Sequence, residues 1–331
     1  MSYIKIVLTR YMSNALKRLG LVIKRTRDID VLKKQYLNAM QVCMNCPNDR
    51  ITDFVVGIVF SKDRPMQLYA LIKSYFENVS SPGSLEVLFH ASNQEYLDAY
   101  LQVQVLCKDY DVKFTKESSF KDDLVQVLSS LEVTKVFFLV DDILFIRHMD
   151  MSFFMNVDLN KHVPSMRLGT NLKRCYTQNV RQPLPLMKEY EKRMSNSPMF
   201  SWSWVDGMFD WAYPLSVDGN VFLLEEILAM AKIGEYRAPN TFEQSLQWFS
   251  LAFSDRYGLC GGQSFLVNIP FNKVQCENSN VSSNVSEKDL LISWCQGNEI
   301  DVSKYYGLNN VSAHQELPLH IVQRKDIDNG N

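Results

Sequence analysis

From about residue 54, the chain alternates short apolar runs with segments of helical periodicity. Residues 54–60 (FVVGIVF) are continuously apolar and rich in β-branched side chains, which predicts a strand covered on both faces. Pro65 then opens a stretch to about Asn78 with apolar residues at helical spacing. Proline is favourable in the first turn of a helix, so we expect a strand followed directly by a helix.

The same alternation continues to Val140. The pattern predicts strands over 85–91, 112–115 and 135–140, and helices from Asn93 to about 107 and over 120–131. Strands that alternate with helices imply right-handed crossovers and a mainly parallel sheet with helices on both faces. In such sheets, ligands bind beyond the carboxyl ends of the strands. The polar residues that follow each strand are therefore the first candidates for chemistry.

Composition narrows the class of protein. The chain has 331 residues, with 46% hydrophobic and 22% charged side chains, which excludes a disordered chain or a coiled coil. The formal net charge of -2 argues against a general nucleic-acid binder. There is no apolar run of about 18 residues that would span a bilayer, and no secretory signal pattern. Cys43 and Cys46 form the only C-x-x-C motif, and there is no second such pair to complete a zinc site. We therefore expect free thiols in a reducing cytoplasm.

The N-terminal segment is strongly basic. Residues 1–36 carry nine Lys and Arg against two Asp, a local charge of +7. Apolar residues recur there at helical spacing, which predicts a basic amphipathic segment. Such a helix can lie on an anionic membrane surface. The alternative is a helical extension that packs on its own domain or on a second subunit.

The turn after the first strand reads Ser61-Lys62-Asp63-Arg64-Pro65 and contains no glycine. A dinucleotide or methyl-donor site would place G-x-G-x-x-G there, so that the backbone can approach the phosphates. No G-x-x-x-x-G-K-[ST] loop occurs either. The sequence therefore disfavours an oxidoreductase, a methyltransferase or a P-loop enzyme.

Asp141 and Asp142 directly follow the apolar strand that ends at Val140. Adjacent carboxylates at the end of a buried strand repel each other, unless a divalent cation supplies the opposite charge. Mg²⁺ and Mn²⁺ prefer carboxylate oxygens together with substrate phosphates. A strand-end turn in which one Asp caps the following residues is the alternative. The position after the fourth strand, with the S-K-D-R turn after the first, favours the cation site.

Eight segments occur in an order that is informative as a whole. They are FSKDRPMQL at 60–68, LFHASN at 88–93, FFLVDDILF at 137–145, SMRLGTN at 165–171, WAYPLSVDG at 211–219, APNTFE at 238–243, NIPFNKVQ at 268–275 and SAHQE at 312–316. In this order, from about Asp53 to His320, the chain resembles nucleotide-sugar glycosyltransferases with the GT-A fold, of the kind found in bacterial surface polysaccharide biosynthesis. The metal motif reads D-D-I rather than D-x-D, which leaves open which carboxylate binds the metal.

The resemblance implies a GT-A-like (Rossmann-like) α/β fold, with a mainly parallel sheet between helices. It also implies a division of the catalytic domain into a nucleotide-binding half (51–150) and an acceptor-binding half (151–320). The residue pattern adds a basic helical extension (1–50) and a polar tail (321–331). The residues implied to bind the nucleotide-sugar are Ser61, Asp63, Arg64, His90, Ser92, Lys121, Asp141 and Arg167. Those implied to bind Mn²⁺ or Mg²⁺ are Asp142, Asp141 and His314, with His320 as the substitute for His314.

The acceptor side has several candidates. Glu243 matches the general base of inverting members, although an early Glu also favours the dipole of a helix that starts near Pro239. The other candidate bases are Asp206, Asp210 and Asp218. Trp202, Trp204 and Trp211 lie between polar residues and suit stacking on an acceptor sugar, and the alternative is an ordinary core.

These inferences together predict a metal-dependent glycosyltransferase. It would move a sugar from a nucleotide diphosphate sugar, UDP-linked by preference, to a glycan or lipid-linked glycan, with inversion favoured. We expect a cytoplasmic protein that reaches the inner face of the membrane through residues 1–36, and a homo-oligomer is compatible with this. The alternatives are a nucleotidyl- or phosphotransferase, which also uses paired carboxylates and a divalent ion, and a non-catalytic GT-A-like protein for glycan binding or assembly.

Overall fold

The computed structural model describes residues 52–195, 197–271 and 286–324. The extension predicted over 1–50, with Cys43 and Cys46, lies outside the described residues. Strand β17 (Ile321–Gln323) pairs with β16 (Asn298–Ile300), so the folded chain continues past the boundary predicted at residue 320. Within the described ranges, no helix has both the length and the apolar character needed to cross a membrane.

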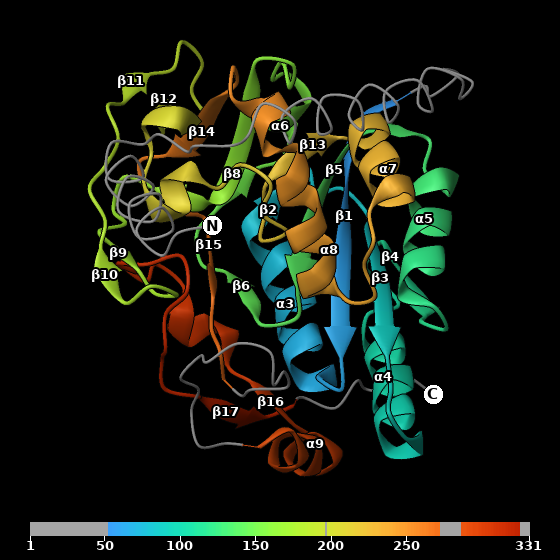
Figure 1. The fold of residues 1–331 in the computed structure, drawn as a ribbon. Coiled ribbons are helices and arrows are strands. Elements are labelled where there is room, and N and C mark those ends of the chain that lie inside the picture. Colours follow the sequence, from blue (N-terminus) through green and yellow to red (C-terminus); the bar gives the residue numbers. More distant parts are fainter. Residues whose placement is uncertain (1–51, 196, 272–285, 325–331) are drawn as a thin grey trace, which may run out of the picture.

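The main sheet has five strands in the order β13-β5-β1-β3-β4 (Figure 1). Their bounds are β1 Thr52–Lys62, β3 Leu85–His90, β4 Val112–Lys116, β5 Val133–Val140 and β13 Val221–Leu223. The pairs β5-β1, β1-β3 and β3-β4 are parallel, and only the edge pair β13-β5 is antiparallel. The predicted mainly parallel sheet is therefore confirmed, and the ends of β1, β3 and β5 meet at one edge.

The helices between these strands also follow the prediction. They are α3 (Pro65–Asn78), α4 (Gln94–Leu106) and α5 (Phe120–Ser130). Asn93 caps α4, because its side chain accepts a hydrogen bond of 3.1 Å from the backbone N of Tyr96. After β13 come α7 (Leu224–Ile233) and α8 (Pro239–Leu246), and near the C-terminus α9 (Glu287–Cys295).

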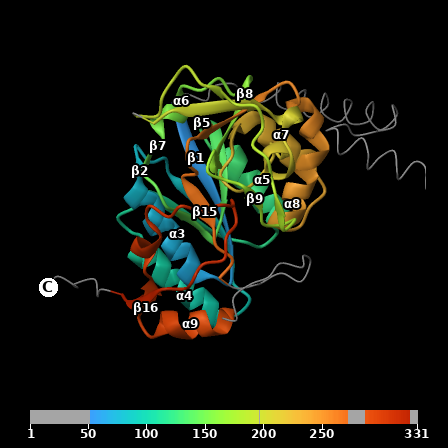
Figure 2. The ribbon, with the colours of Figure 1, turned by 90° about the vertical axis from the view of Figure 1, so that its left-hand side faces the viewer.

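The core lies on both faces of the sheet. Successive side chains of a strand point to opposite faces, so Val55 and Val59 of β1 pack with α3 and α4, whereas Ile58 and Phe60 pack with α5, α7 and α8. In Figure 2 the sheet lies between α3 and α4 on one side and α7 and α8 on the other. This burial on both faces explains why β1 is apolar along its length.

A second sheet extends the fold beside β13. Its order is β11-β12-β14-β8, with bounds β11 Lys188–Glu189, β12 Met199–Ser203, β14 Tyr257–Gly261 and β8 His162–Gly169. An antiparallel bridge between Ser165 and Asn220 joins β8 to the segment just before β13. The backbone N of Met166 also donates a 2.9 Å hydrogen bond to the carbonyl of Gly219. Arg167 is thereby brought next to the residues that lead into β13.

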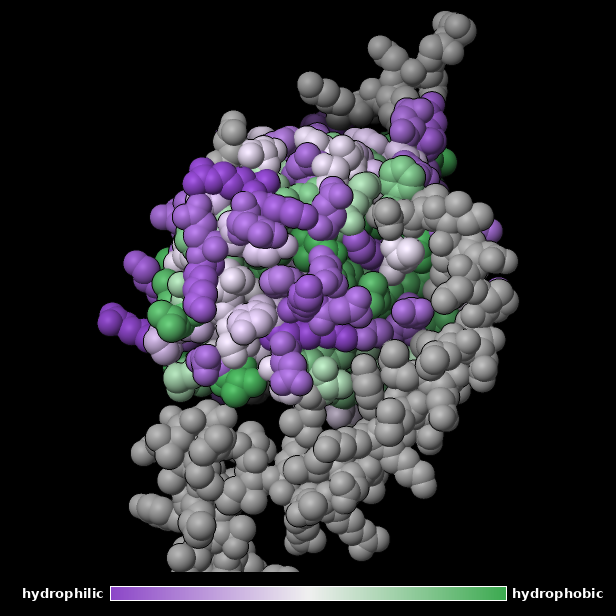
Figure 3. Space-filling model, turned by 90° about the horizontal axis from the view of Figure 1, so that it is seen from above, coloured by the Kyte–Doolittle hydropathy of each residue, from purple (hydrophilic) through white to green (hydrophobic). Residues whose placement is uncertain are grey.

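The remaining elements are short. They are β2 (Val79–Ser80), β6 (Ile143–Phe145), β7 (Met149–Asp150), α6 (Ser152–Met155), β9 (Arg174–Cys175), β10 (Val180–Arg181), β15 (Leu266–Asn268) and the 3-10 turns η1 (Trp204–Asp206), η2 (Phe209–Ala212), η3 (Gln247–Phe253) and η4 (Val302–Tyr305). Figure 3 views the molecule from the side on which β1 begins, and its described surface there is largely hydrophilic with scattered apolar side chains.

Candidate functional site

The two motifs that the sequence singled out meet in direct contact. Strands β1 and β5 are parallel neighbours, so the turn after β1 lies beside the carboxylates after β5. Nη1 of Arg64 donates to Oδ1 of Asp141 at 3.0 Å and to Oδ2 of Asp142 at 2.9 Å. The backbone N of Lys62 donates to the second oxygen of Asp141 at 3.1 Å. The carboxyl edge of the sheet therefore carries a cation between two adjacent carboxylates.

The electrostatics of this contact are dominated by burial. Burial raises the pKa of Asp141 to about 6; the charge of Arg64 opposes this increase, and that of Asp142 adds to it. Burial alone would lower the pKa of Arg64, but Asp141 and Asp142 raise it above its ordinary value. The positive charge expected between the carboxylates is thus supplied here by a guanidinium. A proton on Asp141 competes with any other cation below about pH 6.

Asp63 shapes the turn between β1 and the end of β3. Its backbone lies in the left-handed region with φ of 54°, which is uncommon for residues other than glycine and easiest for Asn and Asp. Its carboxylate accepts hydrogen bonds from the backbone N of Ser92 at 2.8 Å and from the Ser92 hydroxyl at 2.5 Å. The backbone N of Asp63 donates to the carbonyl of His90 at 3.1 Å. The structure therefore brings together three of the predicted donor-site residues.

Tyr100 is a contributor that the sequence reasoning missed. Its hydroxyl lies 2.7 Å from Oγ of Ser61 and accepts a 3.1 Å hydrogen bond from the backbone N of Arg64. Tyr100 belongs to the buried face of α4, where a helical pattern alone predicts a core residue. Only the packing of α4 against the end of β1 shows that the tyrosine holds this turn.

His90 and Lys121 contact side chains other than the paired carboxylates. Nδ1 of His90 lies 3.8 Å from Oε1 of Glu117. Nζ of Lys121 lies 3.8 Å from Oε1 of Glu235 and 5.6 Å from the centre of the Tyr236 ring. Their contacts with a nucleotide stay predictions.

Asp142 is held from its other side by Asn268, at the end of β15. Nδ2 of Asn268 donates to Oδ1 of Asp142 at 2.8 Å, and the backbone N of Ile269 donates to the Asp142 carbonyl at 2.8 Å. The segment 268–275 contributes to the motif resemblance, which assigns no role to Asn268. That segment was the signal that could have drawn attention to it.

The loop that carries His314 runs alongside Asn268. A parallel bridge pairs Asn268 with His314, and Nε2 of His314 lies 3.0 Å from Oδ2 of Asp218. Burial would raise the pKa of Asp218, but the hydrogen bond and charge of His314 lower it. Conversely, burial would lower the pKa of His314, and Asp218 raises it. We interpret the pair as an imidazolium and a carboxylate.

The segment that carries Asp218 pairs with the C-terminal part of β5. The backbone N of Gly219 donates a 2.7 Å hydrogen bond to the carbonyl of Phe138, so Asp218 lies next to the end of β5. The donor motif and the predicted acceptor motif therefore occupy neighbouring positions on the same sheet edge.

Arg167 and Glu243 lie close to Asp218. We call the group formed by Asp210, Asp218 and Glu243, with Arg167 and His314, the acidic cluster. Nη1 of Arg167 lies 3.4 Å from Oδ1 of Asp210, and Nε2 of Gln182 donates to the other oxygen of Asp210 at 3.1 Å. Burial raises the pKa of Glu243, Asp218 raises it further, and a 3.0 Å hydrogen bond from the backbone N of Val217 opposes the increase. Burial would lower the pKa of Arg167, but Asp210, Asp218 and Glu243 raise it.

The four candidate bases are thus in different environments. Asp210 is engaged on both oxygens, Asp218 is paired with His314, and Asp206 is exposed on η1. Glu243 combines a raised pKa with a position beside Asp218. A carboxylate with a raised pKa is a stronger base than an ordinary one, which favours Glu243 among the four as a general base.

The prediction that three tryptophans stack on an acceptor sugar is wrong. Trp202, Trp204 and Trp211 are 1%, 3% and 0% exposed and belong to one hydrophobic cluster. Their rings pack edge to face around Trp202, whose Nε1 donates to the Trp211 carbonyl at 3.0 Å. Trp202 lies on β12, Trp204 on η1 and Trp211 on η2, and all three rings are buried in the core, so their faces are closed to a sugar.

The predicted metal set is only partly assembled. Among the described residues, no three His, Cys, Asp or Glu side chains come together as ligands, and His314 is paired with Asp218. Oδ1 of Asp141 and Oδ2 of Asp142 nevertheless both face Nη1 of Arg64. A divalent ion in that place would meet two carboxylate oxygens, and Mg²⁺ is commonly bound by one or two carboxylates plus substrate phosphates. The donor chemistry fits the ion, provided that Arg64 turns away.

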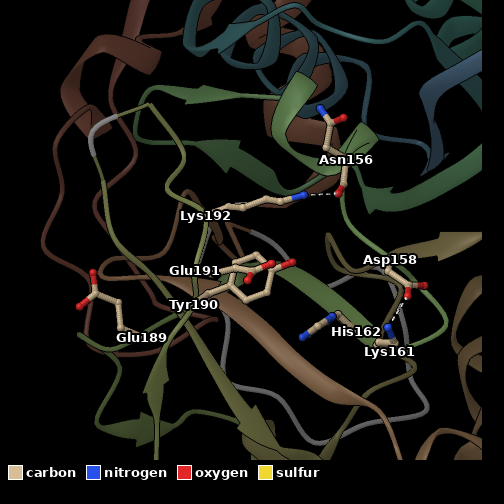
Figure 4. A pocket seen from close by; sticks show the side chains of 8 residues that line it. All are labelled: Asn156, Asp158, Lys161, His162, Glu189, Tyr190, Glu191 and Lys192. Atoms are coloured by element: carbon tan, nitrogen blue, oxygen red, sulfur yellow. Dashed lines mark hydrogen bonds and ion pairs between the residues drawn. The ribbon is translucent and has the colours of Figure 1, made fainter.

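A separate cavity of about 390 Å³ lies around His162 and Tyr190 (Figure 4). Lys161 is 3.4 Å from Asp158, and Nζ of Lys192 donates to the Asn156 carbonyl at 3.2 Å. His162 begins β8, whereas Arg167 lies five residues further on, or about 16 Å along a strand. This cavity contains none of the predicted site residues, and its mixed charges specify no ligand.

Comparison with known proteins gives limited likeness. No protein family model and no curated protein matches the chain. Among solved structures, the bifunctional glycosyltransferase WbbM matches at 13% identity over 59% of this chain and 38% of its own, with a TM-score of 0.33. The mannosyltransferase PcManGT from Pyrobaculum calidifontis, in complex with GDP-Man and Mn²⁺, matches at 15% identity over 42% of this chain and 44% of its own, with a TM-score of 0.27.

The third solved structure is TarS of S. aureus, residues 1–349. It matches at 12% identity over 54% of each chain, with a TM-score of 0.33. The matched region therefore spans between 38% and 54% of the length of these three chains. TM-scores this low carry no functional weight, so function must be inferred from the geometry of the site.

Proposed function

We propose that the protein is a glycosyltransferase that moves a sugar from a nucleotide diphosphate sugar to a glycan or a lipid-linked glycan. The observation that carries this proposal is the contact of Arg64 with both Asp141 and Asp142 at the carboxyl edge of a parallel sheet. That edge is where open α/β sheets bind their ligands. Among nucleotide-sugars we propose a UDP-linked donor, because the sequence motifs resemble those of nucleotide-sugar glycosyltransferases.

The donor side needs to neutralise charge on the departing diphosphate. In the proposal, Ser61 and Asp63 shape the nucleoside end, and Asp141 binds the ribose. Asp142, with Asp141, would hold Mn²⁺ or Mg²⁺, which supplies positive charge to the diphosphate. Arg64, once released from the carboxylates, would provide a second positive charge for the diphosphate.

The acceptor side needs a carboxylate that takes the proton of the attacking hydroxyl. Glu243 is proposed as this base, because its pKa is raised by burial and by Asp218. Two charged neighbours act on Glu243 in opposite directions. Asp218, which is paired with His314, raises the pKa of Glu243, and Arg167 lowers it. In the proposal the acceptor attacks the sugar on the face opposite the departing diphosphate, which gives inversion.

The cellular setting extends the proposal. A lipid-linked acceptor of a capsule or lipopolysaccharide pathway lies at the cytoplasmic face of the membrane, and residues 1–36 carry a charge of +7 that favours anionic lipid. Deleting residues 1–36 should abolish binding to vesicles that contain anionic lipid. Unchanged binding would remove this part of the proposal.

A product assay tests the reaction type. The protein is incubated with a panel of nucleotide-sugars, lipid-linked glycan extract and Mn²⁺, and the released nucleotide is identified. The proposal predicts nucleoside diphosphate, with release lost in Asp142→Asn and retained in the control Asp109→Asn, whose side chain is exposed between α4 and β4. Release of pyrophosphate would instead indicate a nucleotidyltransferase. Glycan binding without turnover would indicate a non-catalytic protein.

A further inference from the structure

We propose that Asn268 is a positioning residue of the donor site, which fixes the carboxylate of Asp142 and ties it to the loop that carries His314. This inference rests on the proposed function. It concerns a residue to which neither the motif resemblance nor the donor chemistry assigns a role.

The first observation is the way in which the Asp142 carboxylate is held. Oδ1 accepts a 2.8 Å hydrogen bond from Nδ2 of Asn268, and Oδ2 accepts a 2.9 Å hydrogen bond from Nη1 of Arg64. Asn268 is 7% exposed, so its amide meets the carboxylate in a buried setting, where such bonds are strong. When Arg64 gives up Oδ2 to a donor or an ion, Asn268 is left to orient the carboxylate.

The neutral amide suits this task. A lysine or arginine at the same place would neutralise Asp142 and compete with the ligand for it. Asn268 donates one hydrogen bond and leaves the negative charge of Asp142 available. In metal sites, partners that orient a ligating carboxylate in this way affect affinity or activity by about 10- to 100-fold.

The second observation is the backbone clasp around Asp142. Strand β15 pairs antiparallel with β6, in the register Asn268 with Ile143. The backbone N of Ile269 also donates to the Asp142 carbonyl at 2.8 Å. None of these bonds uses the Asn268 side chain. The loop should therefore keep its place when that side chain is replaced, and only the orientation of the carboxylate should change.

The third observation is the link to the acceptor side. The backbone N of Asn268 donates to the Ala313 carbonyl, and its carbonyl accepts from the backbone N of Gln315, both at 2.9 Å. These bonds flank His314, whose Nε2 lies 3.0 Å from Asp218. One residue thus joins the donor carboxylate to the histidine of the acidic cluster.

The test compares Asn268→Leu, which keeps the approximate size but removes the donor, with Asn268→Gln, which keeps an amide on a longer side chain. The matched control is Asn298→Leu. Asn298 lies at the start of β16, and its side-chain amide donates a hydrogen bond to Ser293 of α9, away from Asp142. Thermal unfolding of each variant is measured first. Calorimetry then measures the binding of Mn²⁺ alone and the binding of UDP in the presence of Mn²⁺. The product assay described above gives KM for the donor and for the acceptor.

We expect Asn268→Leu to unfold near the wild-type temperature, to bind UDP with Mn²⁺ about 10- to 100-fold more weakly, and to raise KM for the donor but not for the acceptor. Asn268→Gln should recover part of the affinity, and Asn298→Leu should bind as the wild type does. If Asn268→Leu does not fold, Asn268→Ser provides the same comparison.

Wild-type affinity in a folded Asn268→Leu variant would overturn this inference and leave the proposed function standing. Equal losses in Asn268→Leu and Asn298→Leu would also overturn it, because they would show a general structural effect. Failure of the wild-type protein to bind any nucleotide or nucleotide-sugar would overturn the proposed function, and this inference with it.

Discussion

Nε2 of His314 lies 3.0 Å from Oδ2 of Asp218, beside the end of the strand that delivers Asp141 and Asp142. The two residues come from segments almost 100 positions apart in the chain. Their ion pair places an acidic cluster with a candidate base next to a candidate donor site.

The His314–Asp218 pair should make stability depend on pH. The pKa of His314 is raised in the folded protein, so its contribution is fully present below the unfolded value near 6.5 and is lost as pH rises through the folded value. The pKa of Asp218 is lowered, so its contribution is present above its unfolded value and is lost as pH falls through the folded value.

Both contributions are therefore present around pH 6. His314→Gln should lower the free energy of unfolding by about 1–3 kcal/mol at pH 6 and by less at pH 9. Urea unfolding at the two pH values measures this. His148→Gln is the control, since His148 is an exposed residue that contacts Ser80. An effect of His314→Gln that is equal at both pH values would contradict the assigned ion pair.

Arg64→Ala should destabilise the protein by about 3–5 kcal/mol at pH 7.5, because it leaves adjacent buried carboxylates without their cation. The loss should be smaller at pH 5, where Asp141, with a pKa raised to about 6, accepts a proton instead. Denaturant unfolding at both pH values measures the difference. The control Arg193→Ala, whose partner Glu189 is exposed, should change stability by less than about 0.5 kcal/mol.

Glu243→Gln should lower kcat by about 10²- to 10⁴-fold while leaving donor affinity unchanged, since a general base acts on the acceptor. Because the pKa of Glu243 is raised, the wild-type rate should fall as pH drops through that value, where the carboxylate takes up a proton. Asp206→Asn, exposed on η1, should retain kcat. A larger loss in Asp206→Asn than in Glu243→Gln would assign the base to the other residue.

Trp202→Ala should act on stability and not on acceptor recognition. Removing this buried ring should cost about 3–5 kcal/mol, whereas Trp248→Ala should cost little, because Trp248 is 64% exposed. Thermal unfolding measures the difference. A folded Trp202→Ala variant whose only defect is a raised KM for the acceptor would restore the sugar-stacking role.

The sequence predicted the elements between residues 54 and 140 well, because each of them has a local pattern of its own. That the turn after β1 and the carboxylates after β5 lie at the ligand-binding edge also followed from sequence, but the direct contact of Arg64 with Asp141 did not. By contrast, the strands β8, β12 and β14 pair through contacts between distant segments and carry no comparable local signal.

The contacts that Asn268, Tyr100 and Gln182 make could not be predicted for the same reason, although the segment 268–275 already marked the region of Asn268. Each of them contacts a site residue from a distant segment of the chain. Only the folded protein shows which segments lie side by side. The tryptophans show the opposite case, in which a local pattern predicts a site that the fold does not form. Aromatic rings beside carboxylates resemble a sugar site, but burial is decided by the layers that close over them.

The measurement that tests the central claim most directly is calorimetric binding of UDP-, GDP-, dTDP- and CMP-sugars, with and without Mn²⁺. It compares the wild-type protein with Asp142→Asn and with the control Asp109→Asn. The account predicts that a nucleotide diphosphate sugar of one class binds more tightly with Mn²⁺, that Asp142→Asn loses this binding, and that Asp109→Asn retains it. Binding that is equal in wild type and Asp142→Asn, or no binding of any donor, would contradict the account.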